Sequence, residues 1–447
     1  MSERTWGENV YRVGNIEKFD VLSPDESSNI ETQKKHIEPW LAAVFQSEHL
    51  GLLLGSGFTT AVSQCANLST LNMMSNYDGF PLATELKEAA QTSAKLMGRG
   101  EPNIEDQIRC AMALAQGLEI MLDARSQQVS RALDELINDF LRRLLKTERD
   151  LRLKLEECSV PIDEGSGHQD EQDTRGGYKE ILDPLSMLVS FLLSFSSRSA
   201  TRERLQIFTT NYDRLIEYGA DLAGLHLLDR FVGHLEPLFR SSRLDIDMHY
   251  SPPGIRGEPR YLEGVARLTK LHGSLDWVYH NGHVRRVGLP FGAHHDHPLL
   301  NESSDQTVMI YPNSFKDRET AEYPYVELFR DYAAAICRPN SALVTYGYGF
   351  GDEHVNRNIA DMLTIPSTHL VIISYSNEAN RIKSFCRRVG TKEQISLLIG
   401  PHFGAMPTLV EHYLPKPAMD RIIAKRNEIF NVQNLEWDSS KDAEPTI

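Results

Sequence analysis

The sequence predicts an α/β protein with a Rossmann-like parallel sheet flanked by helices, interrupted by a large helical insertion. Short apolar runs that end in glycine or polar residues recur along the chain, as at 51–54 and 342–347. Helical patterns separate these runs, which is typical of parallel sheets. Between about residues 80 and 205, apolar residues instead recur every three or four positions, which predicts helices. The 447 residues, 41% of them hydrophobic, suffice for a packed core and allow more than one domain.

Three parts are expected along the chain. Residues 1–35 are polar and predict a loose or docking arm. Residues 36–400 are expected to form the α/β domain, with a first helix at 36–46. Residues 401–447 are expected to contain an amphipathic helix at 417–431, followed by a mobile polar tail.

Five strands are expected in the main sheet. They are the apolar runs at 51–54, 207–210, 342–347, 369–374 and 395–399. Because helical patterns separate them, we expect them to be parallel. A small hairpin is predicted between Val278 and Val284, because Asn281-Gly282 favours a tight turn.

The insertion at about 80–205 contains two strongly apolar helical segments. The first has apolar residues at 133, 136, 137, 140, 141, 144 and 145, and the second begins at Asp183-Pro184, a cap followed by a first-turn proline. The polar, glycine-rich stretch 161–177 between them predicts a disordered surface loop. The apolar stripes fit ordinary core, with a subunit interface as the alternative. The charged stretch 147–157 fits a solvated helix face, or again an interface.

A polar cluster, Thr209-Thr210-Asn211-Tyr212-Asp213, follows the strand at 207–210, where the next helix begins. In open α/β sheets, ligands bind at the carboxyl ends of the strands. These side chains could therefore bind a sugar, an amide or a water molecule. Capping of the following helix is the alternative interpretation.

A glycine turn follows the strand at 51–54 and opens a helix. Gly55 and Gly57 would let backbone N–H groups approach a phosphate, while Ser56 and Thr59 supply hydroxyls. The helix N-terminus adds a partial positive charge. The turn is not a P-loop, because no Gly-Lys-Ser/Thr follows.

Two further segments carry candidate site residues. His272 precedes Gly273, so a substrate could reach an imidazole that can act as a general base, although an ordinary loop histidine fits as well. The apolar run at 342–347 ends in Gly347 and Gly349, followed by Asp352. Asp352 could cap the next helix or bind ribose hydroxyls.

The four segments resemble the sirtuin-like superfamily in both order and residues, over roughly 45–400. Residues 55–59 look like its GAGxS element, with Ser56 in place of alanine and Thr59 in place of serine. Residues 211–213 look like its N-x-D element, and Leu271-His272-Gly273 looks like its catalytic His-Gly.

Residues 347–354 are similar to the G-Y-S-F-x-D-E-H signature of the bacterial branch of that superfamily, and residues 309–316 also look like that branch. Gly349 stands where the branch often has serine, so a hydroxyl contact to phosphate is lost and a backbone N–H is the expected replacement. Thr210 stands where glutamine usually precedes the asparagine, which alters the nicotinamide pocket.

The zinc module of protein-deacylating sirtuins has no counterpart in this sequence. The five cysteines are isolated, at 65, 110, 158, 337 and 386, so a paired-thiolate zinc site is not expected. Histidines at 280, 283, 294, 295 and 297 could bind a metal, but a solvent-exposed loop is favoured.

The resemblance implies that NAD is the substrate and that the nicotinamide–ribose bond is cut. Gly55, Ser56, Gly57 and Thr59 would then cradle the pyrophosphate. Asn211 would hold the nicotinamide ribose or position the attacking water, Asp213 would bind the nicotinamide side, and His272 would be the base. Thr210, Gly347, Gly349 and Asp352 would complete the binding site.

Zinc-free bacterial members of this kind are mainly cytoplasmic antiphage effectors that deplete NAD. The resemblance therefore also implies a homo-oligomer that works with a HerA-type ATPase partner. A non-catalytic sensor of NAD or ADP-ribose is one alternative. A protein deacylase is less favoured because the zinc module is missing, and a nuclease because no acidic metal-binding signature stands out.

Composition adds only broad limits. No run of 18 apolar residues occurs, and residues 1–13 contain no apolar signal core. Unpaired cysteines suit a reducing cytosol. The formal net charge of −15 does not favour a broad nucleic-acid-binding face.

Overall fold

The computed structural model describes residues 6–18, 27–71, 73–96, 100–157, 183–198, 201–242, 247–250, 260–280, 282–301, 307–310 and 323–416. The loop expected at 161–177, the helix expected at 417–431 and the tail lie outside these residues. Of the segment 309–316, only the first two residues are described, at the end of strand β13 (Thr307–Ile310).

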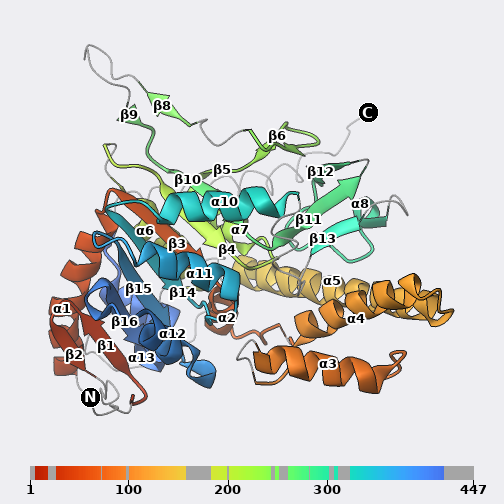
Figure 1. Cartoon of the computed structure of the whole chain (residues 1–447). Helices are drawn as coiled ribbons and strands as arrows, with labels where there is room; N and C mark the ends of the chain where they lie inside the picture. Colours follow the sequence, from red (N-terminus) through yellow and green to blue (C-terminus); the bar gives the residue numbers. More distant parts are fainter. Residues whose placement is uncertain are drawn as a thin grey trace, which may run out of the picture.

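The predicted α/β fold is confirmed by a nine-stranded sheet (Figure 1). The strands lie in the order β2 (Ile16–Lys18), β1 (Val10–Val13), β16 (Ile395–Ile399), β15 (His369–Ser374), β14 (Ser341–Tyr346), β3 (His49–Leu54), β4 (Leu205–Thr209), β10 (Val265–Lys270) and β5 (His226–Leu228). From β16 to β5 all neighbours are parallel. The five predicted strands are thus present, whereas β10 was not predicted.

The expectation of a loose arm at 1–35 is wrong for residues 10–18. Strand β1 pairs antiparallel with β16, and β2 pairs with β1. Val10, Tyr11 and Val13 are buried there, so this segment completes one edge of the sheet. The first helix, α1 (Ser27–Phe45), also begins earlier than the expected residue 36.

Helices cover both faces of the sheet. One face packs against α1, α2 (Ser56–Cys65), α6 (Pro184–Ser196), α7 (Leu215–Ala223), α13 (Pro401–Gly404), α14 (Met406–Thr408) and the short helix η3 (Leu409–Tyr413). The other packs against α10 (Tyr325–Ile336), α11 (Glu353–Met362) and α12 (Arg381–Val389). Because residues 403–414 lie within the main core, the boundary expected at residue 400 does not separate two units.

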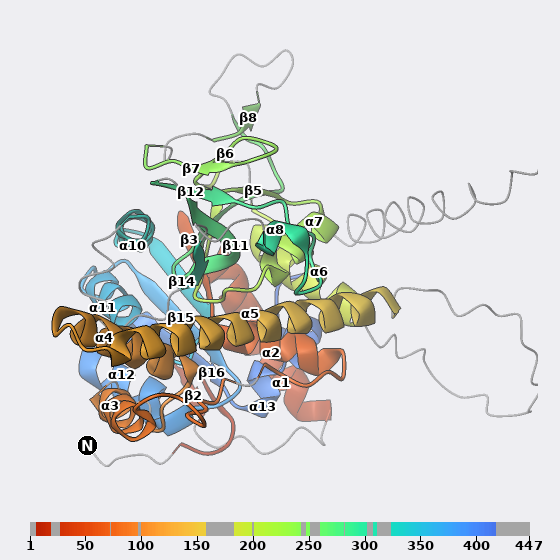
Figure 2. The same ribbon diagram turned by 90° about the vertical axis from the view of Figure 1, so that its right-hand side faces the viewer.

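The helical insertion is shorter than expected. It consists of α3 (Ala83–Leu96), α4 (Ile104–Ile120) and α5 (Arg125–Glu157), which share a hydrophobic core that also includes Tyr212 and Leu275. Asn103 and Asp106 form a capping box at the start of α4. Helix α6, by contrast, packs on the main sheet, with Phe191 against Phe58 and Tyr346, so it does not belong to the insertion. Figure 2 shows α5 running across the molecule.

A second, smaller sheet has the order β13, β11 (Gly273–His280), β12 (His283–Arg286), β7 (Leu238–Phe239) and β6 (Phe231–Val232). The predicted hairpin is confirmed by antiparallel β11 and β12, in which His280 pairs with His283. The remaining short elements are β8 (His249–Tyr250), β9 (Arg260–Tyr261), α8 (Pro298–Asn301), η1 (Glu378–Asn380) and η2 (Lys392–Gln394). None of the described helices combines the length and apolarity needed to cross a membrane.

Candidate functional site

A cavity of about 630 Å³ lies at the carboxyl ends of the central strands. From β3 the sheet continues one way through β4 and β10, and the other way through β14 and β15, so the strand order reverses between β3 and β14. Such a switch point is where open α/β sheets bind ligands. The structure brings all eleven sequence-predicted site residues to this cavity, namely Gly55, Ser56, Gly57, Thr59, Thr210, Asn211, Asp213, His272, Gly347, Gly349 and Asp352.

Three of the glycines allow two turns to cross in direct backbone contact. A Cβ atom on Gly55 would lie 2.5 Å from the carbonyl oxygen of Gly347, and one on Gly57 would lie 2.6 Å from the Cα atom of Gly347. The Gly57 N–H donates to the Gly347 carbonyl at 2.9 Å, and the Gly55 N–H donates to that of Tyr346 at 3.2 Å. The N–H groups of Gly55 and Gly57 are therefore occupied within the protein, so the phosphate contact predicted for this turn would have to come from its other groups.

A buried hydrogen-bond network joins α2 to the end of β4. The Asn211 side-chain amide donates to the Gly55 carbonyl at 3.1 Å and to Thr59 Oγ1 at 3.0 Å, and Thr59 in turn donates to Asp213 Oδ2 at 2.8 Å. The other carboxylate oxygen of Asp213 accepts the Leu215 N–H and caps α7. These bonds fix the orientation of the Asn211 amide and leave its Oδ1 atom without a hydrogen bond among the described residues.

His272 and Asp352 form a hydrogen bond at the cavity, with 2.8 Å between Nε2 and Oδ2. Asp352 Oδ1 accepts the N–H groups of His354 and Val355, so Asp352 caps α11, which is the first of the two roles expected for it. An ionised Asp352 carboxylate can only accept hydrogen bonds, so it pairs with a proton on His272 Nε2. When the imidazole is neutral, Nδ1 is then the ring nitrogen that carries the lone pair. The imidazole is mostly buried, with 14% of its side chain exposed.

The insertion forms one wall of the cavity. Tyr212 donates a hydrogen bond to Glu105 at 3.1 Å and packs its ring edge-on against Phe140 of α5. Arg214 forms a two-pronged ion pair with the fully buried Glu148 of α5, and its own backbone N–H donates to the same carboxylate at 2.7 Å. Although burial alone would lower the pKa of Arg214, the Glu148 carboxylate raises it. The predicted polar cluster is thus attached to both the sheet and the insertion.

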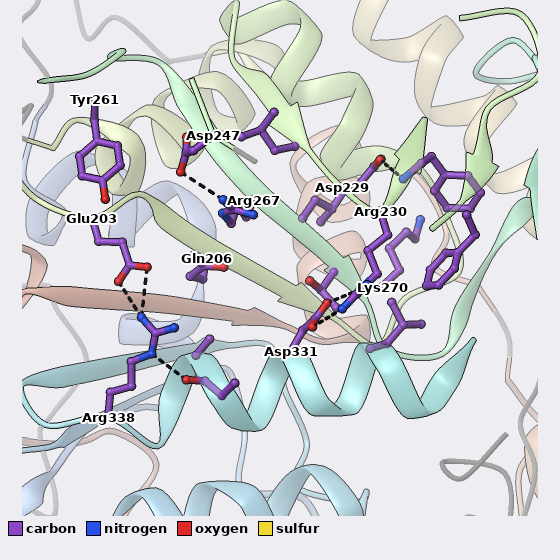
Figure 3. Close-up of a pocket in the computed structure, with 18 of the residues that line it drawn as sticks. Glu203, Gln206, Asp229, Arg230, Asp247, Tyr261, Arg267, Lys270, Asp331 and Arg338 are labelled. Carbon is purple, nitrogen blue, oxygen red and sulfur yellow. Dashed lines mark hydrogen bonds and ion pairs between the residues drawn. The ribbon is translucent and has the colours of Figure 1, made fainter. Parts of the chain in front are cut away.

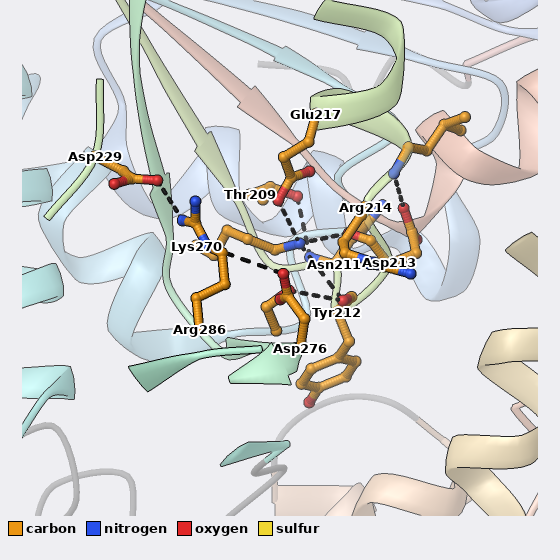
Figure 4. Close-up of polar contacts among 12 residues, drawn as sticks. Thr209, Asn211, Tyr212, Asp213, Arg214, Glu217, Asp229, Lys270, Asp276 and Arg286 are labelled. Atoms are coloured by element: carbon orange, nitrogen blue, oxygen red, sulfur yellow. Dashed lines mark hydrogen bonds and ion pairs between the residues drawn. The ribbon is translucent and has the colours of Figure 1, made fainter. Parts of the chain in front are cut away.

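Lys270, at the end of β10, extends its side chain toward the cluster (Figure 4). Its buried ammonium donates to the backbone carbonyl of Asp213 and pairs with Glu217 Oε1 at 3.1 Å. Burial raises the pKa of Glu217, and Lys270 opposes that rise. The carbonyl contact holds residue 213 in place just after β4, which further fixes the neighbouring Asn211.

Two groups of cavity residues were not predicted from the sequence. The first group ends β15 or follows it: Ser374, Tyr375, Ser376, Glu378 and Arg381. The second belongs to the insertion or the segment that leads into it: Leu71, Met73, Asn103, Glu105, Leu144 and Thr147. The first group carries the same signal as the predicted one, since polar residues follow a correctly predicted strand. The second group has no comparable signal, because only tertiary packing brings it to the sheet edge.

A second cavity, of about 340 Å³, lies between β10 and α10 (Figure 3). Its charged side chains are matched in pairs, such as Arg230 with Asp331 and Arg338 with Glu203. No sequence-predicted site residue is among the described residues that line it. The first cavity is therefore the candidate site.

Among the described residues, one group has ligand atoms close enough to hold a metal ion: His294, His295 and Asp296. All three are exposed, and they lie outside the set of residues that lines the candidate cavity. The four described cysteines, at 65, 110, 337 and 386, are free thiols. The described lining of the cavity offers the amide of Asn211, the imidazole of His272, carboxylates, hydroxyl groups and the guanidinium of Arg381.

Comparison with known families adds an independent finding. Residues 205–392 match the model of the SIR2-like domain, which is less than half of the chain. No curated protein matches the sequence. The matched range contains Asn211, His272 and the 347–352 turn, whereas the glycine turn at 55–57 lies outside it. SIR2-like domains fit NAD-binding and NAD-processing enzymes, and residues 205–392 of this chain are similar to such a domain.

Proposed function

We propose that this protein hydrolyses NAD at the nicotinamide–ribose bond, giving nicotinamide and ADP-ribose. The observation that carries the proposal is the convergence of four separate segments on one cavity, with Asn211 and His272 following neighbouring strands. Adjacent strands lie about 4.8 Å apart, so both side chains can address one reacting centre. The SIR2-like match supports NAD as the class of substrate.

The cavity fits such a substrate in size and in the groups it offers. Its volume of about 630 Å³ lies within the range of roughly 300–1,000 Å³ that is usual for ligand sites. Asn211 Oδ1 and His272 Nδ1 are acceptors with no hydrogen bond to the described residues. Each is held in orientation by hydrogen bonds of the other polar atom of its side chain, Nδ2 in Asn211 and Nε2 in His272, so both are preorganised.

The proposed reaction passes through an oxocarbenium-like centre at C1′ of the ribose. The C1′–N bond breaks and its electron pair goes to the pyridine nitrogen, so nicotinamide leaves as a neutral molecule. Water forms the new C1′–O bond, and His272 Nδ1 accepts the proton that water loses. Asn211 Oδ1 accepts a hydrogen bond from the attacking water and places a negative dipole end beside the developing charge. The products are nicotinamide, ADP-ribose and one proton.

Hydrolysis is favoured over deacylation by the cysteine pattern. No CxxC pair occurs anywhere in the sequence, so the zinc module of deacylating sirtuins has no counterpart. Water is then the simplest acceptor for the ADP-ribosyl group.

We further propose that this activity serves antiphage defence by depleting NAD in the infected cell. The support is the resemblance of residues 347–354 and their neighbours to the zinc-free bacterial branch. Uncontrolled NAD hydrolysis would kill the host. We therefore also propose that the protein is a homo-oligomer whose activity is controlled by a HerA-type ATPase partner.

The test is nicotinamide release from NAD by the purified protein, alone and with any co-encoded ATPase. Asn211→Ala and His272→Ala should each lower turnover by at least about 100-fold, the lower range for loss of a general base. His283→Ala, at an exposed histidine of β12, is the matched control and should retain full turnover. Full turnover in His272→Ala would overturn the mechanism. ADP-ribose binding without turnover under any condition would favour a sensor.

A further inference from the structure

The candidate cavity is short of positive charge for an anionic ligand. Its described lining contains the acids Glu105, Asp213, Asp352 and Glu378, but Arg381 is its one lysine or arginine. The diphosphate of a dinucleotide carries two negative charges. A site that binds it therefore needs donors that outweigh this acidic lining.

The two glycines of the turn do not supply those donors. The N–H groups of Gly55 and Gly57 already donate to the carbonyl groups of Tyr346 and Gly347. The Thr59 hydroxyl already donates to Asp213, so the groups left on that side of the cavity, such as the Ser56 hydroxyl, are neutral. Neutral hydroxyls bind phosphate less strongly than a charged donor does.

Arg381 lies at the carboxyl ends of the central strands, beside the turn that follows β14. Its guanidinium Nη2 atom lies 3.6 Å from the position that a Cβ atom on Gly349 would take. Two residues in the left-handed region, Ala379 (φ 48°) and Asn380 (φ 55°), turn the chain sharply before Arg381 begins α12. The absence of a side chain at residue 349 leaves the guanidinium open to the cavity.

The present partner of Arg381 can be exchanged. Its Nη2 atom pairs with Glu378 Oε2 at 3.0 Å, but the Glu378 side chain is 72% exposed, whereas that of Arg381 is 18% exposed. Exposed pairs of this kind contribute little. A guanidinium binds phosphate through two parallel hydrogen bonds, which are stronger and better oriented than this contact.

We propose that Arg381 is the residue that binds the diphosphate of the dinucleotide, in place of the glycine-turn N–H groups. The inference rests on the proposed function for its ligand but not on catalysis. A diphosphate beside Arg381 and Gly349 leaves the nicotinamide ribose directed toward Asn211 and His272, because β4 and β10 lie on the other side of β3 from β14.

The test is binding of ADP-ribose, measured by titration calorimetry on the full chain. Arg381→Gln should weaken ADP-ribose binding roughly 10- to 100-fold, as expected for loss of a charge-assisted hydrogen-bond pair. The ADP-ribose affinity of Arg381→Lys should lie between those of the wild type and Arg381→Gln, because an ammonium keeps the charge but cannot form two parallel hydrogen bonds. Raising the salt concentration should weaken binding to the wild type more than binding to Arg381→Gln.

Two controls separate this effect from general damage. Arg388→Gln removes an exposed arginine from the same helix, where it pairs with exposed Glu353, and should leave affinity unchanged. Glu378→Gln frees the guanidinium and should leave affinity unchanged or raise it. Unchanged ADP-ribose affinity in Arg381→Gln would overturn this inference alone. A wild-type protein that binds ADP-ribose but never turns NAD over would overturn the hydrolase and leave the inference standing. One that releases nicotinamide from NAD but does not bind ADP-ribose would overturn the inference and leave the hydrolase standing.

Discussion

The glycines at the sheet edge differ in what they do, although the sequence alone suggests one shared role. Gly347 has φ +62°, and a Cβ atom there would lie 2.5 Å from the backbone of Gly57. Gly349, two residues on, has no positive φ and meets only the end of Arg381. The first glycine is required by the crossing of two turns, and the second leaves space for a guanidinium.

This difference predicts that two substitutions in one turn change the free energy of unfolding by different amounts. Gly347→Ala should lower the free energy of unfolding by more than about 1 kcal/mol from its backbone conformation alone, and further through the clash with Gly57. Gly349→Ser should change it by less than about 0.5 kcal/mol, because ordinary contact distances remain. Urea unfolding of both variants measures this difference. Equal destabilisation by the two substitutions would contradict the crossing as the reason for the glycines.

At the scale of elements, the residues after β4 alternate in direction. Asn211 and Asp213 turn toward α2, whereas Tyr212 and Arg214 turn toward the insertion. The site loop is therefore held between two layers of the molecule. The buried pair of Arg214 with Glu148 is the charged contact that attaches it to α5.

Breaking that pair should destabilise the whole domain. Glu148→Gln leaves a buried guanidinium without its carboxylate, which should lower the free energy of unfolding by about 3–5 kcal/mol. Glu157→Gln is the control on the same helix, because its pair with Lys154 is exposed and should contribute less than about 1 kcal/mol. Chemical denaturation followed by circular dichroism measures both. If the two variants unfold alike, the Glu148 contact is not an anchor.

The elements that the sequence predicted well are those with a strong local signal. Strands β15 and β16 are continuous apolar runs buried on both faces, and their predicted bounds are the observed ones. Strand β10 reads Val-Ala-Arg-Leu-Thr-Lys, and its polar side chains conceal it. Strand β1 is hidden because its pairing partner, β16, lies almost 400 residues away.

The same limit applies to the site. The predicted residues each follow a strand or open a helix, so their place at the sheet edge follows from fold class. Arg381 comes seven residues after β15 and reaches the cavity through an irregular turn, and the wall residues Glu105 and Leu144 reach it through packing of the insertion. No local sequence pattern predicts that these residues reach the cavity.

At the scale of the whole molecule, one partly buried histidine links the N-terminal elements to the sheet. His369 on β15 hydrogen-bonds Ser396 of β16 at 2.9 Å, and Trp40 of α1 donates to the same hydroxyl. Burial, with a smaller effect of the nearby Arg12, lowers the pKa of His369 to about 4. The folded protein therefore holds this imidazole neutral at pH values where the unfolded chain protonates it.

The free energy of unfolding should therefore depend on pH in this range. Between the ordinary histidine pKa of about 6.5 and the folded value of about 4, the unfolded state binds more protons, so stability falls as the pH falls through this window. His369 contributes up to about 3 kcal/mol to this loss of stability.

His369→Gln keeps a hydrogen-bonding group but cannot titrate, so its unfolding free energy should fall less steeply between pH 6.5 and 4.5 than that of the wild type. His226→Gln, at an exposed histidine, should follow the wild-type profile. Since burial also lowers the pKa of His402, some slope should persist in His369→Gln. If the unfolding free energy of His369→Gln and of the wild type falls equally as the pH falls, His369 is protonated in the folded protein. Its contact with Ser396 would then make no contribution to the loss of stability in acid.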